Sequence, residues 1–295
     1  MTEILRTPDE AFVGIPDYPF QPHYFDWEGI RMHYLDEGEG KPVVLFHGQP
    51  TWSFLYRKVI PPLVAAGYRC IAPDYVGLGK SDKPVDDQFF TFEMHAASVS
   101  ALLESLALED ATVVGQDWGG PIGLRFGVEH PETVRRLVVL NTGLFTGRGT
   151  MSEAWMQFRD WVAKTPDLPV DFLMSRSEAH PWGGDVIAAY AAPFPSIEHK
   201  AGIRRFPMMV PLSGDDPGAV EMLAVREALA RWENPAYVLF STGDPIFSTR
   251  TGARLTELIP GAGQLDTIDN AAHFLQEDQG EEVGRRIAAW LSETE

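Results

Sequence analysis

Residues 115–120 read Gly-Gln-Asp-Trp-Gly-Gly, and this stretch decides how the rest of the sequence is interpreted. It follows the apolar run 112–114 and opens a helical pattern over 121–130. A strand, a glycine-rich turn and a helix in this order are typical of the nucleophile elbow G-x-S-x-G, here with Asp117 in the nucleophile position. The glycines are needed because a sharp turn leaves no room for a Cβ beside the nucleophile. A helix N-cap is the alternative interpretation of Asp117, since Asp often caps helices and suits the positive end of the helix dipole.

Short apolar runs, each followed by a turn and a helical pattern, recur along the chain. They lie at residues 43–46, 70–72, 112–114, 137–140, 237–240 and 265–268. Runs of this length are typical of parallel strands buried on both faces. Their alternation with helices predicts an α/β fold with a doubly wound, mostly parallel sheet. Near the N-terminus, the alternating segments 23–27 and 30–36 flank Glu28-Gly29 and predict a hairpin.

The alternation of predicted strands and helices stops between residues 146 and 217. This stretch has helical periods, several prolines and large aromatic residues that include Trp155, Phe158, Trp161 and Trp182, but no clear strand. A gap of this length is too long for a loop in a compact domain. We therefore predict a core formed by residues 1–145 and 218–295, with 146–217 inserted as a helical cap over the edge of the sheet where open α/β sheets bind ligands.

Composition narrows the possible partners and compartments. The chain has 295 residues, with 24 Lys and Arg against 42 Asp and Glu, a formal net charge of −18 at pH 7. Such a charge disfavours binding to nucleic acid or to an anionic membrane surface. Cys70 is the single cysteine, so neither an intrachain disulfide nor a cysteine metal cage can form. The first residues lack a signal-peptide pattern and no run approaches the roughly 20 apolar residues of a membrane span, which predicts a soluble, cytoplasmic protein.

Two further residues follow predicted strands and complete a catalytic set with Asp117. Asp244 comes after the run 237–240, and His273 comes after the run 265–268. Each alone has an ordinary interpretation, as a turn residue or an isolated histidine. Together they match the chain order nucleophile, acid, histidine, and we predict that the three form a catalytic triad. The other histidines have no metal-ligand spacing, so no metal site is predicted.

A polar turn after the run 43–46 supplies a candidate oxyanion loop. Residues 47–50 read His-Gly-Gln-Pro, which a simple tight turn also explains. The backbone N–H groups of Gln49 and of Trp118, the residue after the nucleophile, can jointly hold a developing negative oxygen. A second glycine-containing loop, 74–82, lacks the spacing of a dinucleotide fingerprint and is interpreted as structural.

The combined motifs resemble the haloalkane dehalogenases, in the branch whose catalytic acid follows the penultimate core strand. The resemblance rests on residues 47–53, 115–120, 192–195 and 273–278, and it extends over nearly the whole chain. It implies an α/β-hydrolase fold and a hydrolase that acts on carbon–halide bonds without a cofactor. The implied reactants are a small neutral halogenated alkane and water, and the products are an alcohol, a halide ion and a proton.

The resemblance also implies a mechanism. Asp117 attacks the halogen-bearing carbon and forms an alkyl ester, a step that a carboxylate ionised at pH 7 performs without a base. His273 then activates a water that hydrolyses the ester, and Asp244 orients the imidazole. The backbone N–H groups of Gln49 and Trp118 stabilise the oxyanion that forms in this second step. The side chain of Gln49 is a candidate for positioning the water.

The halide site is where the sequence departs from the family pattern. Trp118 matches the first halide-binding tryptophan of the family, with an indole N–H on an apolar body. The second is a tryptophan of the cap, but counting back from Pro166 places Phe158 there, and phenylalanine has no donor. We expect Trp155, one helical turn away, to supply the indole instead. Trp161 is the other candidate, and core packing is the alternative role for both.

Two other functions are compatible with parts of this sequence. An epoxide hydrolase of the same fold also uses an aspartate nucleophile, but it needs a pair of cap tyrosines, and Tyr190 is the only tyrosine between residues 146 and 210. A non-catalytic ligand-binding protein of this fold would not need the complete triad. An esterase is excluded because the elbow has no serine. The sequence leaves open the preferred haloalkane and the oligomeric state.

Overall fold

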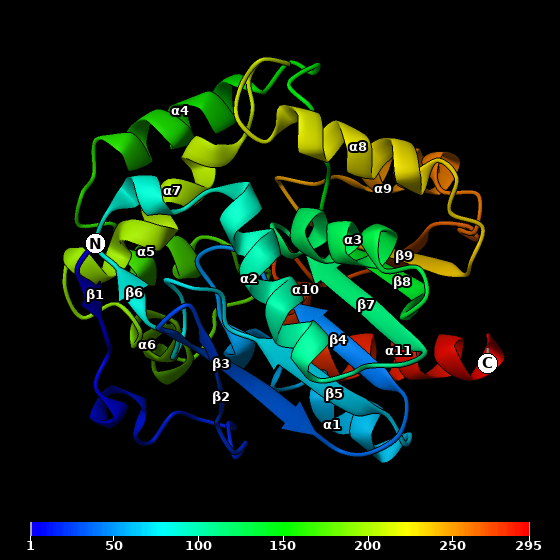
Figure 1. Ribbon diagram of the computed structural model, residues 1–295, viewed down its shortest axis with the longest axis horizontal. Coiled ribbons are helices and arrows are strands. Elements are labelled where there is room, and N and C mark those ends of the chain that lie inside the picture. The colour runs from blue at the N-terminus through cyan, green and yellow to red at the C-terminus, as the bar shows by residue number, and fades with distance from the viewer. Residues whose placement is uncertain (1, 295) are drawn as a thin grey trace.

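The central feature is an eight-stranded sheet, seen in a computed structural model that describes residues 2–294 (Figure 1). The strand order is β10-β9-β8-β7-β4-β5-β3-β2. Strands β4, β5, β7, β8, β9 and β10 pair in parallel, while β3 is antiparallel to both β5 and β2. The strands are β2 His23–Trp27, β3 Ile30–Glu37, β4 Pro42–Phe46, β5 Arg69–Pro73, β7 Ala111–Gln116, β8 Val134–Leu140, β9 Ala236–Ser241 and β10 Asp266–Ile268. The predicted α/β-hydrolase fold is confirmed.

Burial explains why the apolar runs form the middle of the sheet. Every residue of β4 and β7 is buried, as expected for parallel strands covered by helices on both faces. The predicted hairpin is β2 and β3, and its turn residues Glu28 and Gly29 have φ angles of 54° and 83°. One small sheet was not predicted, formed by β1 Ile4–Leu5 and β6 Lys83–Pro84, because two-residue strands carry no periodic signal.

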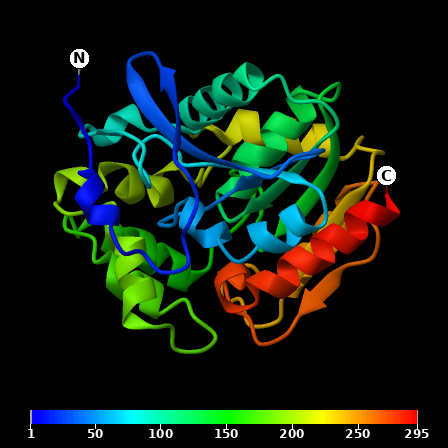
Figure 2. The same ribbon diagram turned by 90° about the horizontal axis from the view of Figure 1, so that it is seen from below.

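Helices cover both faces of the sheet (Figures 1 and 2). On one face α3 packs against α2 and α8, and on the other α1 packs against α11. The helices outside residues 146–217 are α1 Ile60–Ala65, α2 Phe92–Ser105, α3 Gly119–Glu129, α8 Ala219–Leu229, α9 Thr249–Leu258, α10 Leu275–Asp278 and α11 Gly280–Glu293, with short 3-10 helices η1 Asp9–Phe12, η2 Ser53–Tyr56 and η3 Asp87–Phe89.

The chain between β8 and β9 begins with four helices that add no strand to the sheet. They are α4 Glu153–Ala163, α5 Val170–Ser175, α6 Gly184–Ala191 and α7 Ala201–Met209, with a 3-10 turn, η4 Glu198–Lys200, before α7. Helix α4 begins where Ser152 accepts a hydrogen bond from the backbone N–H of Trp155, and it packs against α7. In Figure 1 these helices gather beside the carboxyl end of β4, the edge that carries the candidate site.

The loop at 74–82 forms contacts within the core. Asp74 lies 2.8 Å from Nδ1 of His33 and accepts hydrogen bonds from the backbone N–H groups of Ser53 and Lys80. Burial opposes its charge, but His33, His47 and the backbone N–H of Lys80 lower the pKa of Asp74 to about 2. The contacts agree with a structural role for this loop. Within residues 2–294, no helix is both long enough and apolar enough to span a bilayer.

Candidate active site

Asp117 occupies a strained turn between β7 and α3. Its φ angle is 51°, a left-handed conformation that costs a non-glycine residue on the order of 1–2 kcal/mol. The chain around it approaches so closely that side chains are excluded. A Cβ on Gly48 would lie 2.3 Å from the Cβ of Asp117, and one on Gly119 would lie 2.1 Å from the carbonyl oxygen of Phe46. The geometry is that of a nucleophile elbow, and the glycines around it are required because no larger residue fits there.

Asp117 is not the N-cap of α3, so the alternative interpretation was wrong. The N-cap residue is Trp118, and no side chain caps the helix. Oδ1 of Asp117 instead accepts a hydrogen bond from the backbone N–H of Gln49, at 2.9 Å. The carbonyl oxygen of Asp117 accepts a hydrogen bond from the hydroxyl of Thr142, at 2.6 Å, which helps to hold the turn. The carboxylate therefore points toward the loop after β4 rather than back onto its own helix.

The structure brings the three predicted catalytic residues together. Nδ1 of His273 lies 3.0 Å from Oδ2 of Asp244, and Nε2 lies 3.6 Å from Oδ2 of Asp117. The second oxygen of Asp244 accepts a hydrogen bond from the backbone N–H of Ile246. The Asp244 and His273 side chains are nearly inaccessible, while that of Asp117 is 14% exposed. The His273 imidazole thus links the buried carboxylate of Asp244 to the carboxylate of Asp117, which remains partly exposed.

The electrostatics of His273 follow from this arrangement. Burial opposes the charged imidazolium, but Asp244 and Asp117 outweigh it and raise the pKa of His273 to about 10. The resting site therefore holds a protonated histidine between two carboxylates. A chemical change that neutralised Asp117 would remove part of the stabilising charge and would lower the pKa of His273.

Two residues that the sequence did not single out hold the histidine loop. The side-chain amide of Asn141 donates to the carbonyl oxygens of Ala272 and His273, at 3.0 and 3.1 Å, and its oxygen accepts the backbone N–H of Ser241. Nε2 of Gln116 donates to the carbonyl oxygen of His273, at 3.1 Å. A polar residue directly after a predicted buried strand was the available signal for Asn141, and Gln116 adjoins the elbow itself.

The two predicted backbone donors differ in their relation to the Asp117 carboxylate. The N–H of Gln49 is already bonded to it, whereas the N–H of Trp118 has no hydrogen-bond partner among the residues that the structure describes. The side-chain Nε2 of Gln49 donates to the carbonyl oxygen of Ile203 in α7, at 3.2 Å. This bond ties the loop after β4 to the helices between β8 and β9.

Trp118 lies in an aromatic environment. Its ring centroid lies 5.3 Å from that of Phe206 and 6.5 Å from those of Phe92 and Phe145. The side chain is buried, and within the described part of the chain no acceptor is bonded to its indole N–H. An indole N–H that has no protein acceptor and lies among aromatic rings is available to an anionic ligand.

On α4 the structure distinguishes the two candidate tryptophans. Nε of Arg159 donates to the carbonyl oxygen of Pro207 in α7, at 3.2 Å, and Val162 on the same side is buried. Trp155 precedes Arg159 by four residues and Val162 by seven, so it lies on the face directed toward α7. Trp161 lies to one side of this face, where its ring contacts Phe158 and the half-exposed Phe172 of α5.

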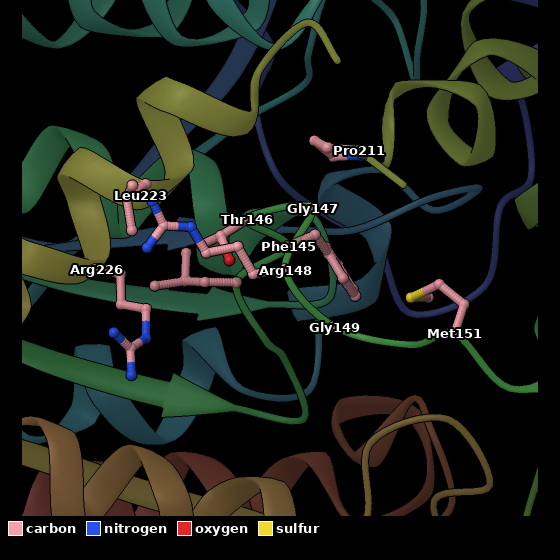
Figure 3. Close-up of a pocket in the computed structure, with 10 residues that line it drawn as sticks. Phe145, Thr146, Gly147, Arg148, Gly149, Met151, Pro211, Leu223 and Arg226 are labelled. Carbon is pink, nitrogen blue, oxygen red and sulfur yellow. The ribbon is translucent and has the colours of Figure 1, made fainter. Parts of the chain in front are cut away.

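A cavity of about 360 Å³ lies near this site but is distinct from it (Figure 3). Phe145 connects the two, because its ring lies 6.5 Å from that of Trp118 and 6.0 Å from that of Phe247. None of the predicted site residues lines the cavity. Its lining consists of Leu144, Phe145, Thr146, Gly147, Arg148, Gly149, Met151, Pro211, Leu223 and Arg226. Residues 2–294 contain no cluster of three or more side chains suited to hold a metal ion.

Comparison with known proteins identifies the family. Residues 41–184 match the model of the alpha/beta hydrolase fold. A haloalkane dehalogenase of Mycobacterium marinum is 44% identical, over 98% of this chain and 99% of the relative. The chain belongs to the haloalkane dehalogenases. It is accordingly a hydrolase that acts on carbon–halide bonds, as predicted.

Other haloalkane dehalogenases support this assignment. A relative from Mycobacterium tuberculosis is 42% identical over 99% of this chain and all of its own length. The solved structure of a haloalkane dehalogenase from Paraglaciecola agarilytica, described as tetrameric, superposes with a TM-score of 0.91. It has 35% sequence identity and covers 96% of this chain and 97% of its own. The resemblance therefore extends from the motifs to the whole chain.

Proposed function

We propose that this haloalkane dehalogenase hydrolyses small neutral haloalkanes through a covalent alkyl ester on Asp117, at a site covered by residues 146–217. The observation that carries the proposal is the different environment of the two oxygens of that carboxylate. Oδ1 accepts the backbone N–H of Gln49, while Oδ2 has no hydrogen bond from residues 2–294 and faces His273 at 3.6 Å. One oxygen is held in place and the other is available to react.

In the first step an oxygen of Asp117 forms a bond to the halogen-bearing carbon. The carbon–halogen bond breaks, and the halide leaves with its electron pair. Oδ2 is the oxygen that we assign to this attack. The ester's carbonyl oxygen is then Oδ1, which already accepts a hydrogen bond from the N–H of Gln49.

In the second step a water attacks the ester carbonyl carbon and gives its proton to Nε2 of His273. Negative charge develops on Oδ1, where the N–H groups of Gln49 and Trp118 stabilise it. The bond between the carbonyl carbon and the alkyl oxygen then breaks, and the alcohol leaves with the second proton of the attacking water. This restores the Asp117 carboxylate and leaves His273 protonated, as in the resting site. Asp244 stabilises the imidazolium, and because the ester carries no charge, His273 loses a proton more readily in the intermediate than in the resting enzyme.

The halide leaves toward the indole N–H groups of Trp118 and Trp155. Charge accumulates on the halogen as the bond breaks, so donors in a water-poor pocket lower the barrier. Trp118 has a free indole N–H, and Trp155 lies on the face of α4 that is directed toward α7. A helical cap formed by 146–217 would exclude water from this pocket. The neutral alkane is also a more natural substrate for a chain of net charge −18 than an anionic haloacid.

The structure disfavours the epoxide hydrolase. That reaction needs cap phenols aimed at the substrate oxygen, yet the hydroxyl of Tyr190 is buried and donates to Oε2 of Glu277, at 2.6 Å. No other tyrosine lies between residues 146 and 210. Tyr190 is therefore committed to a structural hydrogen bond.

Halide release tests the proposed function. The purified enzyme should release bromide from 1,2-dibromoethane and related bromo- and chloroalkanes, and it should leave styrene oxide unchanged. Asp117→Ala provides the blank and should lower halide release by about 10⁴-fold or more. Hydrolysis of the epoxide without halide release would favour the epoxide hydrolase. Binding of haloalkanes without turnover would favour a ligand-binding protein.

A further inference from the structure

The short helix α10 connects the histidine loop to the helices between β8 and β9. It begins two residues after His273 and carries two adjacent carboxylates, Glu277 and Asp278, each of which accepts a hydrogen bond from one of those helices or the loop before them. In Figure 2 the yellow-green loop before α6 reaches toward the orange-red start of the C-terminal helices. The two carboxylates are adjacent in sequence, but they are bonded to different parts of the core.

Glu277 anchors α10 to the core. Both of its oxygens accept hydrogen bonds from Arg57, at 2.5 and 2.7 Å, and Lys58 donates to it at 2.6 Å. The hydroxyl of Tyr190 in α6 adds a fourth hydrogen bond, at 2.6 Å. The Glu277 carboxylate thus accepts three hydrogen bonds from Arg57 and Lys58 besides that from Tyr190, and none of these four bonds involves the backbone of the histidine loop.

Asp278 joins the loop before α6 directly to the histidine loop. Its Oδ2 accepts the backbone N–H of Ala272, the residue before His273, at 2.9 Å. Its Oδ1 accepts the indole N–H of Trp182, at 2.8 Å. The backbone N–H of Ala179 donates more weakly to the carboxylate, at 3.2 Å from Oδ2 and 3.4 Å from Oδ1. The Asp278 carboxylate therefore accepts hydrogen bonds both from Ala272, next to the catalytic imidazole, and from Trp182, more than 90 residues earlier in the chain.

Ring contacts reinforce this link. The Trp182 ring lies 6.3 Å from that of Phe274, and the Phe274 ring lies 4.7 Å from that of His273. Asn141 and Gln116 hold the carbonyl side of the same loop. The imidazole is thus fixed from the sheet on one side, and from Trp182 through Asp278 on the other.

We propose that Trp182 is a positioning residue for His273, acting through Asp278 on the backbone of Ala272, and that it supports ester hydrolysis without affecting ester formation. The proposal rests on the proposed function, because it divides that reaction into two halves. Asp117 forms the ester without help from His273, so a misplaced imidazole slows only the second half. Residues that orient a catalytic group by hydrogen bonding act in this way.

Trp182→Phe removes the indole donor and retains an aromatic ring beside Phe274. Tyr190→Phe is the matched control, because it removes one donor from the neighbouring carboxylate Glu277, which has no bond to Ala272. Rapid-quench measurement of bromide release and of alkyl-enzyme by intact mass separates the two steps. We expect Trp182→Phe to slow ester hydrolysis roughly threefold to tenfold, since only part of the contribution of a charged hydrogen bond reaches His273. Ester formation should change by less than about twofold.

A second measurement does not depend on turnover. Hydrogen exchange at the backbone amide of Ala272 should be faster in Trp182→Phe and unchanged in Tyr190→Phe. Asp278→Asn, which perturbs the same tether from its centre, should act in the same direction as Trp182→Phe.

The proposal is overturned if Trp182→Phe slows both steps equally or slows neither, or if exchange at Ala272 does not change. An equal effect in Tyr190→Phe would also overturn it, because general docking of α6 would then be responsible. A wild-type enzyme that released no bromide would instead refute the proposed function, and amide exchange would still decide whether the tether exists.

Discussion

Nε2 of His273 lies 3.6 Å from Oδ2 of Asp117, in contact with the carboxylate but beyond normal hydrogen-bond length. On the other side of the ring, Nδ1 is hydrogen-bonded to Asp244 at 3.0 Å. The imidazole is therefore oriented by the acid on one side, while on the other Nε2 lies beside the nucleophile and 3.3 Å from Nε2 of Gln116. This relationship leads to predictions that separate the role of the histidine from that of the carboxylate.

Replacing His273 should stop the reaction halfway. In His273→Gln, Asp117 still forms the ester, but no base activates the water. We expect one equivalent of bromide per enzyme, followed by turnover reduced by about 10³-fold or more. Intact mass spectrometry should show the enzyme with an added alkyl group. Continuous turnover by this variant near the wild-type rate would contradict the assigned role of His273.

The two steps should depend differently on pH. In the resting enzyme the pKa of His273 is raised to about 10, partly by the charge of Asp117. Ester formation removes that charge, so the unprotonated base should appear at a lower pH in the intermediate. Single-turnover kinetics should show ester hydrolysis rising with pH, with an apparent pKa below that of the resting enzyme, while the alkylation burst shows no such rise. A burst and a hydrolysis rate with the same pH profile would contradict this prediction.

The same raised pKa predicts a pH-dependent contribution to stability. A histidine whose pKa is higher in the folded protein than in the unfolded chain stabilises the fold fully below the unfolded value of about 6.5. That contribution is lost as the pH rises through about 10. The free energy of unfolding of the wild type, relative to that of His273→Gln, should therefore decrease between these two limits. Denaturant titrations at several pH values test this, and a constant difference would argue against a charged His273 in the resting protein.

The halide site can be located by fluorescence. Bromide should quench tryptophan emission in the wild type, and Trp155→Phe should remove part of that quenching and weaken halide binding by about tenfold. Trp161→Phe is the control, because Trp161 contacts Phe158 and Phe172 to one side of the face that is directed toward α7. If quenching changes only in Trp161→Phe, that residue is the donor; if it changes in neither variant, no indole of α4 touches the halide.

The close approach at the elbow predicts a strong effect of one methyl group. Gly48→Ala would place a Cβ 2.3 Å from the Cβ of Asp117, so the carboxylate must move. A displacement of about 1 Å at a reacting group costs about 10²-fold in rate. Gly184→Ala is the matched control, since an added Cβ there meets no atom within 4 Å. Halide release by Gly48→Ala at close to the wild-type rate would show that the elbow tolerates the displacement.

Local patterns in the sequence were sufficient to predict the sheet and the triad. Buried parallel strands are short apolar runs, and the carboxyl ends of such strands meet at one edge of a sheet, so Asp117, Asp244 and His273 were expected to converge. The glycines of residues 115–120 were likewise expected from the sharp turn at the nucleophile. These features depend on the nearest neighbours of each residue in the sequence.

Contacts between distant segments were decided only by the tertiary structure. The helix-cap interpretation of Asp117 failed because its carboxylate bonds to Gln49, which comes from another strand end. No periodic pattern in the sequence signals that Asn141 supports the histidine loop, or that Asp278 links this loop to Trp182. A hydrogen bond between residues about 100 positions apart depends on how the elements pack. The sequence by itself therefore determined the chemistry at the strand ends, and tertiary packing determined how firmly each reacting group is held.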